Sequence, residues 1–599
     1  MHVFATAGHV DHGKSALVRA LTGIEPDRWD EERRRGLTID LGYAWTRLPS
    51  GAPVAFVDVP GHQRFIGNML AGLGPTSAVV FVVAADEGWR QQSTEHLAAV
   101  HALGISRGLL VVTRSDLADP SPALADGLAR LSRTSLGDVE AVAVSALSGE
   151  GMPGLVAALD RLAAATPLPR ADGRVRLWVD RAFTIRGSGT VVTGTLGEGS
   201  ISVGDEVELA GRSARVRGLE SMEEQRDRVG PVSRVAVNLR GLGVAEVSRG
   251  DVLLTPGAWR QTSVLDVRVE PVGGPGQSGT APGARRPLPQ QLTLHVGTTS
   301  VQVHVRPLGA DTVRLVLDGP LPLVAGDRAI LRDPGAKRVV AGALVLDADP
   351  PELRRRGAAA RRGVELAGAT GTPDVAEEVG RRGAMRVVDA TALGIPVPTS
   401  AVGDVAVDGP WLVSGAALQR WSTALSEAVR RRVAEHPLEP SLTSEAAVAV
   451  AGVPDRALLP RVVGAAGLEL VEGRVWVPGV RASLGAAESG LRALEERLAQ
   501  TPFAAPEQPE LDAWGLGRAE VAAAVRTGRL LRLDDGVLLR PDAPARAMRV
   551  LAGLPQPFTL SEARQALATT RRVAVPLLEH LDSRGWTRRV DGSHRQVVR

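Results

Sequence analysis

The eight residues from Gly8 to Ser15 restrict the N-terminal fold more tightly than any other segment of the chain. They read Gly-His-Val-Asp-His-Gly-Lys-Ser and match the phosphate-binding loop G-x-x-x-x-G-K-[ST] at every fixed position. Apolar residues 3–7 before the loop predict a buried strand, and residues 15–21 after it have the apolar spacing of a helix. In such a unit, the loop N–H groups and the helix N-terminus face phosphate oxygens. The order of elements favours a nucleotide-binding α/β domain over a plain glycine turn, with Gly8, His9, Val10, Asp11, His12, Gly13, Lys14 and Ser15 as phosphate-binding residues.

The lysine of this loop is unusual for the chain. Of the 70 basic residues only Lys14 and Lys337 are lysines, and all others are arginines. A planar guanidinium cannot replace a compact ammonium placed between the β- and γ-phosphates of a nucleotide. We therefore expect nucleotide phosphates to be the reason that position 14 has remained lysine.

Length and composition exclude several classes of protein. A chain of 599 residues is expected to form about four or more domains. The absence of cysteine excludes disulfides and thiolate metal sites. No apolar run reaches the length of about 18 residues that predicts a membrane span, and the N-terminus lacks a signal-peptide pattern. We expect a cytoplasmic protein with no membrane partner, and the net charge of +3 does not by itself indicate nucleic-acid binding.

A second motif, Asp58-Val-Pro-Gly61, follows the apolar residues 54–57 and therefore lies at the end of a strand. Asp58 is expected to hold the Mg²⁺ shell through water, and the N–H of Gly61 to contact the γ-phosphate. Ser15 would bind Mg²⁺ directly, and Thr38, in the loop between the first helix and this strand, would be the third ligand. Loss of the γ-phosphate would release Thr38 and Gly61, which predicts a two-state switch.

His62 follows the glycine that would sense the γ-phosphate, and we expect it to position the attacking water. Phosphoryl transfer needs mostly placement and charge stabilisation. The arginines at 33–35 are better interpreted as a solvated loop face than as a source of transition-state charge. Intrinsic hydrolysis is therefore expected to be slow.

Base recognition is expected at Thr113-Arg114-Ser115-Asp116, which follows the predicted strand 108–113. Asp116 would accept the N1 and N2 protons of guanine, which adenine cannot supply. Most GTPases carry Asn-Lys-x-Asp here, and replacement of Asn by Thr113 removes the amide that braces the loop. The backbone of Ser145, Ala146 and Leu147, after a further strand, would hold the guanine O6. The expected ligands are GTP or GDP with Mg²⁺, on an open parallel sheet with right-handed crossovers.

Three segments together, Gly-His-Val-Asp-His-Gly-Lys-Ser, Arg-Gly-Leu-Thr-Ile-Asp and Asp-Val-Pro-Gly-His, resemble the translational GTPases of the elongation factor Tu group. Residues 183–194 look like the second domain of that group, a β-barrel that grips the aminoacylated end of tRNA. Residues 37–44 and the Thr-Arg-Ser-Asp segment more closely resemble the selenocysteine-specific elongation factors, whose members commonly carry Thr in place of the usual Asn.

The expected fold is multidomain. An α/β P-loop GTPase domain at 1–172 is followed by β-barrel domains at 173–257 and 258–352, in which residues 272–283 form a flexible insertion. Acid-glycine turns at Asp408-Gly409, Glu472-Gly473, Asp535-Gly536 and Asp591-Gly592 recur after helical segments. Helices followed by a hairpin describe tandem winged-helix (α+β) domains, which we place at 371–434, 435–482, 483–541 and 542–599.

The resemblance implies a selenocysteine pocket on the first barrel. The matching positions are Asp180, Arg181 and Arg240. A selenol is ionised at neutral pH whereas a serine hydroxyl is not, so fixed cations would favour the selenolate. The alternative is that Asp180 and Arg181 form an exposed edge pair and Arg240 is structural.

The resemblance also implies that the tail binds an mRNA hairpin, and charge favours the last winged helix for this role. Residues 540–599 contain eleven arginines and five acidic residues. Candidate RNA-binding residues are Arg571, Arg572, Arg588, Arg589 and Arg595. For Trp586 we favour core packing over stacking on a base, and Pro576 predicts that the last long helix begins near it. The first three winged helices are expected to be spacers.

The resemblance as a whole implies a monomeric GTPase, stimulated by the ribosome, that delivers selenocysteinyl-tRNA at UGA codons. Two alternatives remain at this point. A general or initiator tRNA carrier would lack the repeated tail, and a nucleotide-gated winged-helix regulator that binds DNA would lack the two barrels.

Overall fold

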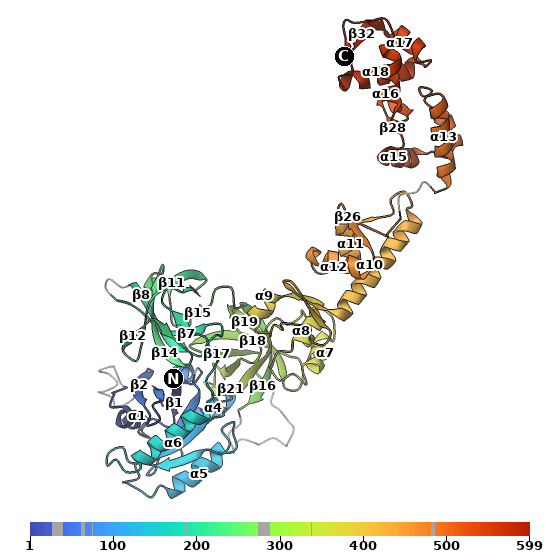
Figure 1. Ribbon diagram of the computed structural model, residues 1–599. Helices are drawn as coiled ribbons and strands as arrows, with labels where there is room; N and C mark the ends of the chain where they lie inside the picture. The colour runs from blue at the N-terminus through green and yellow to red at the C-terminus, as the bar shows by residue number, and fades with distance from the viewer. Residues whose placement is uncertain are drawn as a thin grey trace. The chain divides into compact units, whose positions relative to one another are not determined.

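The computed structural model describes residues 1–26, 40–61, 66–74, 76–185, 189–272, 288–336, 338–480 and 485–598 (Figure 1). They form two compact units. The first comprises Met1–Glu378, Met385–Val402 and Val407–Leu412, and the second comprises Val379–Ala384, Gly403–Ala406 and Val413–Arg599. No helix in the described part of the chain is long and apolar enough to cross a membrane.

The N-terminal domain is a six-stranded sheet covered by helices on both faces (Figure 1). The strands are β1 (His2–Ala7), β2 (Gly42–Arg47), β3 (Pro53–Asp58), β4 (Ala78–Ala84), β5 (Gly108–Thr113) and β6 (Glu140–Ala143), in the order β2-β3-β1-β4-β5-β6. All neighbours are parallel except the edge pair β2–β3. The helices are α1 (Lys14–Thr22), α3 (Ile66–Leu73), α4 (Gln91–Ala102), α5 (Ser121–Leu131) and α6 (Met152–Ala165).

Alternate residues of each strand reach opposite faces of this sheet. Val3 and Ala5 belong to a core that includes residues of α3, α4 and α5, whereas Phe4 belongs to a second core with residues of α1 and α6. Burial on both faces explains the continuous apolar runs of the parallel strands. It also places the loops that follow β1, β3, β5 and β6 along one edge of the sheet, where ligands of such sheets bind.

The first barrel is built on a seven-stranded sheet, β10-β15-β7-β8-β14-β11-β12, in which β10 also pairs with β11. Its strands are β7 (Arg176–Ile185), β8 (Gly189–Leu196), β10 (Glu206–Leu209), β11 (Arg212–Ser221), β12 (Glu224–Arg226), β14 (Ser233–Arg240) and β15 (Val252–Leu254), with the separate pair β9 (Ile201–Ser202) and β13 (Arg228–Val229). A register shift between Val179 and Arg181 marks a bulge in β7.

The second barrel closes in the order β16-β19-β18-β17-β20-β21. Its strands are β16 (Thr262–Pro271), β17 (Gln291–Val296), β18 (Thr299–Pro307), β19 (Thr312–Leu321), β20 (Arg328–Asp333) and β21 (Arg338–Asp347). Helix α7 (Ala358–Glu365) follows the barrel, and the buried residues Leu308 and Leu346 of the barrel segment cluster with Leu366 at the end of the helix.

The remaining residues form small helical clusters with short hairpins. Their elements are α8 (Val375–Arg382), β22 (Ala384–Arg386), α9 (Val387–Ala392), β23 (Val405–Asp408), β24 (Trp411–Ser414), α10 (Gly415–Glu435), β25 (Leu442–Thr443), α11 (Ser444–Ala451), α12 (Leu459–Ala465), β26 (Glu469–Val471), β27 (Arg474–Trp476), α13 (Glu488–Gln500), α14 (Gln508–Ala513), α15 (Arg518–Arg526), β28 (Leu531–Arg532), β29 (Leu538–Leu539), α16 (Ala543–Ala552), β30 (Phe558–Thr559), α17 (Leu560–Ala566), α18 (Arg571–Ser583), β31 (Thr587–Arg589) and β32 (His594–Val597). Each of the four predicted acid-glycine turns lies between two of these strands.

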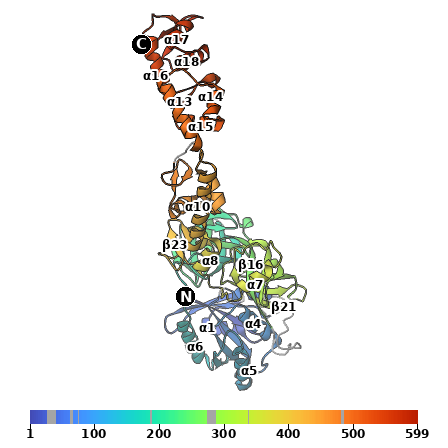
Figure 2. The ribbon, with the colours of Figure 1, turned by 90° about the vertical axis from the view of Figure 1, so that its right-hand side faces the viewer.

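The hairpin turn at Glu472-Gly473 shows why glycine recurs there. Both residues have positive φ, 49° and 73°, as a two-residue turn between twisted strands requires. Helices α13–α18 share one core, which includes Leu494 and Leu577 (Figure 2). The prediction for α18 is wrong at its start, because the helix begins at Arg571 and passes through Pro576.

Candidate functional site

The predicted phosphate loop joins β1 to α1 at the ligand-binding edge of the sheet. Two of its positions require glycine. Gly8 has φ of 134°, and a Cβ on it would lie 2.1 Å from the carbonyl oxygen of Val82. Gly13 has φ of 76° and caps α1. The loop is therefore pressed against β4, with its backbone exposed to a ligand.

Lys14 lies over this loop. Its side chain is buried, and Nζ donates to the carbonyls of His9 at 2.7 Å and Gly8 at 3.2 Å. A Cβ on Gly61 would lie 2.8 Å from this Nζ and 2.6 Å from the Cα of Val10. The structure thus brings together the lysine predicted to contact phosphates and the glycine expected to sense the γ-phosphate.

Two of the three predicted magnesium ligands are adjacent. Ser15 Oγ donates to Asp58 Oδ2 at 2.6 Å, and Thr6 Oγ1 donates to Asp58 Oδ1 at 2.6 Å. Hydroxyl and carboxylate oxygens are the ligands that Mg²⁺ prefers, so this pair fits the ion. Thr38, the third predicted ligand, and His62, the predicted water-positioning residue, both lie outside the described residues.

The hydroxyl of Thr113 takes the place of the amide that an asparagine at this position would provide. Its Oγ1 donates to the carbonyl of His12 at 2.8 Å in a buried position. The amide is absent, as the sequence indicates, and a hydroxyl links the two loops in its place. Sequence reasoning missed it, since it needs the distance between the loops after β1 and β5.

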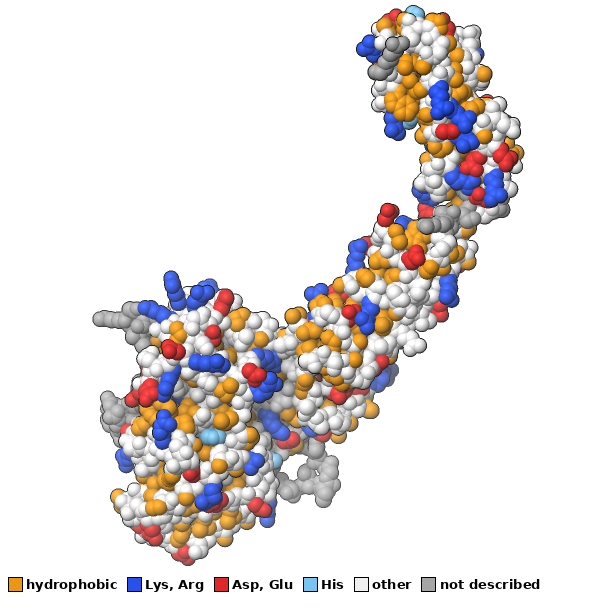
Figure 3. Space-filling model, in the orientation of Figure 1, with side chains coloured by type: hydrophobic (Ala, Val, Ile, Leu, Met, Phe, Trp, Pro, Cys, Tyr) orange, Lys and Arg blue, Asp and Glu red, His pale blue; other side chains and the backbone are white. Residues whose placement is uncertain are grey.

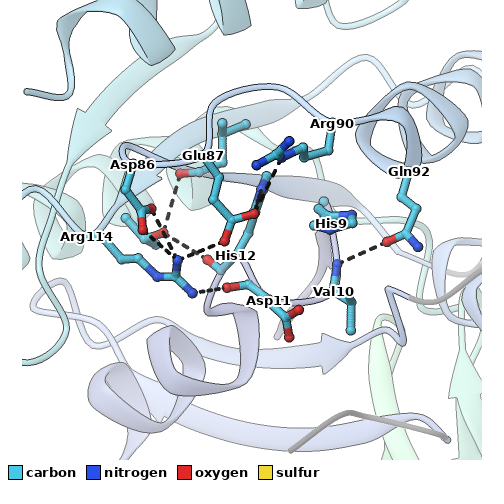
Figure 4. A network of polar contacts seen from close by, with 12 residues as sticks. His9, Val10, Asp11, His12, Asp86, Glu87, Arg90, Gln92 and Arg114 are labelled. Carbon is cyan, nitrogen blue, oxygen red and sulfur yellow. Dashed lines mark hydrogen bonds and ion pairs between the residues drawn. The ribbon is translucent and has the colours of Figure 1, made fainter. Parts of the chain in front are cut away.

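Arg114 makes a second link between these loops (Figure 4). The residue has a left-handed backbone with φ of 59°, and its guanidinium donates to Asp86 at 2.9 Å and Glu87 at 3.0 Å. It also donates to the carbonyl of Asp11 in the phosphate loop. The pair of carboxylates thus holds the arginine over the loop, where most GTPases have a lysine.

The predicted base-binding residues follow β5 and β6. Asp116 and Leu147 are exposed, with Leu147 91% accessible, while Ser145 is buried and accepts from the N–H of Ser148 at 3.1 Å. The N–H of Ser115 donates to the carbonyl of Val144 at 3.2 Å, which joins the two loops. An exposed carboxylate beside a short turn suits recognition of a purine edge.

Two residues of α4 hold the phosphate loop from behind, and sequence analysis missed both. The N–H of Gly8 donates to Nδ1 of His96 at 3.1 Å, and the N–H of Val10 donates to Oε1 of Gln92 at 3.3 Å. The signal was present, because positions 92 and 96 are four apart and therefore share one helix face.

His96 also contacts the second motif. Its imidazole is 4% exposed and faces the carbonyl of Gly61. Burial, with the nearby Lys14 ammonium, lowers the pKa of His96 to about 3, so the ring is neutral. Because Nδ1 accepts from Gly8, the proton is on Nε2, which can donate to the carbonyl of Gly61.

Two of the three predicted pocket residues lie at the bulge of β7, against the N-terminal domain. Asp180 is buried and accepts from Thr193 at 2.7 Å and from the guanidinium of Arg234 at 2.5 and 2.8 Å. Arg181 donates to Asp40 Oδ2 at 3.1 Å and to the carbonyl of Leu41 at 3.0 Å.

Arg240, the third predicted pocket residue, is not part of this cluster. It lies exposed at the end of β14, opposite Arg215 of β11. Arg234 is the arginine that the fold brings to Asp180, and its guanidinium also stacks on Tyr43 at 4.0 Å. A cavity of about 220 Å³ lies beside them, lined in part by Arg181, Phe183, Thr193 and Arg234.

The five predicted RNA-binding arginines of the last winged helix differ in their exposure and in whether other groups of the protein already bind them. Arg571 and Arg588 are exposed. Arg572 donates to the carbonyls of Ala505 and Pro506 at 3.0 and 3.2 Å, Arg589 pairs with Glu579 at 3.4 Å, and Arg595 is buried with Asp582 at 2.9 Å.

Trp586 is not a core residue, contrary to our interpretation, because 41% of it is exposed. Basic side chains are visible around apolar ones on the surface of this last winged helix (Figure 3).

These features define the chain as a P-loop GTPase that carries two β-barrels and a winged-helix tail. Family models match four stretches. The elongation factor Tu GTP binding domain matches residues 1–165, and elongation factor Tu domain 2 matches residues 189–254. The beta-barrel domain of the selenocysteine-specific elongation factor matches residues 286–352, and the winged helix of elongation factor SelB matches residues 549–596.

Curated relatives give the family. A selenocysteine-specific elongation factor of Desulfomicrobium baculatum is 30% identical over 645 residues, covering 99% of this chain and 99% of that protein. The factor of the same name from Escherichia coli strain K12 is 35% identical over 364 residues, covering 59% of this chain and 56% of that protein. The chain belongs to the family of selenocysteine-specific elongation factors.

A solved structure shares the fold. The crystal structure of a bacterial selenocysteine-specific elongation factor, EF-Sec, matches with a TM-score of 0.72 and 24% identity, covering 100% of both chains. The fold of this chain is therefore one found in a solved protein.

Proposed function

We propose that this GTPase delivers selenocysteinyl-tRNA to the ribosome at UGA codons, while its last winged helix binds an mRNA hairpin. The observation that carries the proposal is the cluster at the bulge of β7. Arg181 of the first barrel binds Asp40 and Leu41, which directly follow the loop containing Thr38. A change in that loop on loss of the γ-phosphate would therefore reach the barrel that resembles a tRNA-gripping domain.

The nucleotide site supplies the switch. Lys14 would contact the β- and γ-phosphates, and Ser15 and Asp58 would hold Mg²⁺, which neutralises phosphate charge. We propose Thr38 as the third ligand and His62 as the residue that positions water. Replacement of His62 by alanine is expected to retain GTP binding and abolish ribosome-stimulated hydrolysis, and persistence of stimulated turnover would assign the role to another residue.

The selenolate is proposed to bind beside Asp180, Arg181 and Arg234, with Arg240 as a more distant candidate. A hydrogen bond to a charged group contributes about 1.5–3 kcal/mol. One such contact therefore favours a selenolate over a neutral hydroxyl by about tenfold to a hundredfold. Arg234 is already oriented by the buried carboxylate of Asp180 at 2.5 Å, so little ordering is required on binding.

For the mRNA hairpin, the exposed Arg571 and Arg588 are the proposed phosphate contacts. Hairpin RNA is recognised by its shape, its phosphates and its unstacked loop bases, and the exposed ring of Trp586 offers a surface for one such base. Replacing Arg571 and Arg588 by alanine should weaken hairpin binding and flatten its salt dependence. An unchanged salt slope would contradict the assignment.

Filter binding tests the main proposal. The full-length protein with GTP is mixed with the same tRNA carrying selenocysteine or serine. Strong preference for the selenocysteinyl form is expected, whereas equal retention indicates a general tRNA carrier. Binding of duplex DNA in place of either tRNA would favour a regulator and reject the proposal.

A further inference from the structure

The residues that connect the second barrel to α7 and form the first turns of α7 include five arginines, of which Arg362 attaches the helix to the barrel. Residues 354–362 read Arg-Arg-Arg-Gly-Ala-Ala-Ala-Arg-Arg. Arg362 is buried, with Nε donating to Asp266 at 2.8 Å and Nη2 donating to Asp347 at 2.5 Å. These two carboxylates belong to β16 and β21, so Arg362 fixes α7 to the barrel wall.

Two further contacts make this attachment rigid. A Cβ on Gly363 would lie 2.4 Å from the carbonyl oxygen of Leu308, so the helix backbone approaches the barrel as closely as glycine permits. Arg268 of β16 donates to the carbonyls of Leu366 and Ala367, both at 2.9 Å, at the C-terminal end of the helix. The outer face of α7 is therefore held in one position.

Three arginines are gathered at the start of this fixed helix without counter-charges. Arg355, Arg356 and Arg361 are exposed, and among the described residues no carboxylate pairs with any of them. The N–H of Ala358 donates to the carbonyl of Arg355 at 3.0 Å, which ties that residue to the helix. A guanidinium nitrogen of Arg361 lies 3.4 Å from the position of a Cβ on Gly357, so it points back to the same end.

The acidic residues of this segment are already engaged. Glu352 pairs with Arg354, and Asp349 pairs with Arg260 at 2.8 Å. Three like charges held together repel one another, so the bare patch is electrostatically unfavourable and an anionic partner would relieve it. We define Arg355, Arg356 and Arg361 as the α7 arginine patch.

We propose that the α7 arginine patch binds the phosphodiester backbone of RNA. Guanidinium groups bind phosphate oxygens in a bidentate manner. Protein interfaces have cores depleted in charge and rich in aromatic residues, whereas the large apolar side chain exposed on α7 is Val364 alone. A phosphate backbone requires no apolar contact, so RNA fits the patch better than a protein surface does.

This inference rests on the proposed function, which supplies two sources of such a backbone: the carried tRNA and ribosomal RNA. The triple variant R355A/R356A/R361A is compared with wild type and with R354A in the full-length protein. Arg354 is the matched control, because it is an exposed neighbour whose charge is already balanced by Glu352. One arm measures binding of selenocysteinyl-tRNA with GTP at several salt concentrations, and the other measures binding to ribosomes.

Loss of three phosphate contacts should reduce the magnitude of the negative slope of log affinity against log salt by about two to three. This change is expected in whichever of the two measurements, tRNA or ribosome binding, involves the RNA that the patch contacts. This corresponds to a loss of affinity of about a hundredfold to a thousandfold at 0.1 M salt, relative to 1 M salt. A change in the tRNA arm alone assigns the patch to tRNA, and a change in the ribosome arm alone assigns it to ribosomal RNA. R354A should behave as wild type in both.

Unchanged slopes in both arms, with wild type retaining selenocysteinyl-tRNA, would overturn the patch assignment and leave the proposed function intact. Wild-type protein that retains neither selenocysteinyl-tRNA nor ribosomes would reject the proposed function and this inference together. A variant with the single reversal R356E, which alters an exposed side chain, repeats the comparison if the triple variant is poorly folded.

Discussion

The two backbone contacts of His96 are separable by substitution. The ring accepts from the N–H of Gly8 through Nδ1 at 3.1 Å, and its other nitrogen faces the carbonyl of Gly61. In asparagine the amide oxygen lies near the position of Nδ1, whereas in glutamine the amide nitrogen reaches the position of Nε2. His96→Asn therefore retains the link to Gly8, and His96→Gln retains the link to Gly61.

The expected loss of nucleotide affinity follows from the burial of the backbone group that each variant leaves unpaired. Leaving a buried donor or acceptor unpaired costs about 1–3 kcal/mol, which is about 5-fold to 150-fold in affinity. In His96→Asn the unpaired group is the carbonyl of Gly61. The N–H of this same glycine is expected to contact the γ-phosphate. This variant should weaken binding of a GTP analogue by that factor and change GDP binding much less. In His96→Gln the unpaired group is Gly8 in the phosphate loop, so both nucleotides should be weakened equally.

The assay is stopped-flow measurement of fluorescent GDP and of a non-hydrolysable fluorescent GTP analogue, with urea unfolding to confirm that each variant is folded. His101 is the matched control, because it lies on the same helix and its Nδ1 accepts from Ser135 at 3.0 Å, away from the nucleotide loops. His101→Asn should leave the ratio of GTP to GDP affinity unchanged. An equal loss for both nucleotides in His96→Asn would refute the reasoning.

Three further predictions concern the same unit. Thr113→Val removes the donor to His12 and should weaken GDP and GTP about 5-fold to 150-fold in equilibrium titrations, while Thr113→Ser retains both affinities. Arg234→Ala leaves the carboxylate of Asp180 buried and unpaired and should lower the free energy of unfolding by about 3–5 kcal/mol, with partial recovery in the double variant with Asp180→Asn. Burial lowers the pKa of His96 to about 3 and of His12 to about 4, below the unfolded value of about 6.5. Stability is therefore present above pH 6.5 and lost as pH falls, by up to about 1.4 kcal/mol per pH unit for each histidine, and urea titrations with no such slope would contradict this.

The placement of the candidate nucleotide-site residues follows largely from the sequence, because they occur in short motifs attached to strands. Gly8 to Ser15 follows β1 and Asp58 ends β3, so the carboxyl ends of neighbouring parallel strands bring them together without further information. What sequence reasoning missed are links across different elements. The bonds from His96 to Gly8 and from Thr113 to His12 span 88 and 101 positions along the chain. A local pattern indicates that Gln92 and His96 share one helix face, but the packing of α4 and β5 determines which loop each side chain reaches.

The arginine beside Asp180 shows the limit of pattern reading most clearly. Arg234 and Arg240 are six residues apart on β14, so strand alternation places both on the same face of the sheet. At about 3.3 Å per residue they are separated by about 20 Å along the strand, and only one can reach the carboxylate. Register decides which: β14 pairs Arg234 with Thr195 of β8, while β7 pairs Trp178 with that same threonine and then bulges at Asp180. A bulge adds a residue and re-aims its side chain, and no sequence motif marked its position. Resemblance to the family motif selects Arg240, whereas the pairing of β7, β8 and β14 places Arg234 beside Asp180.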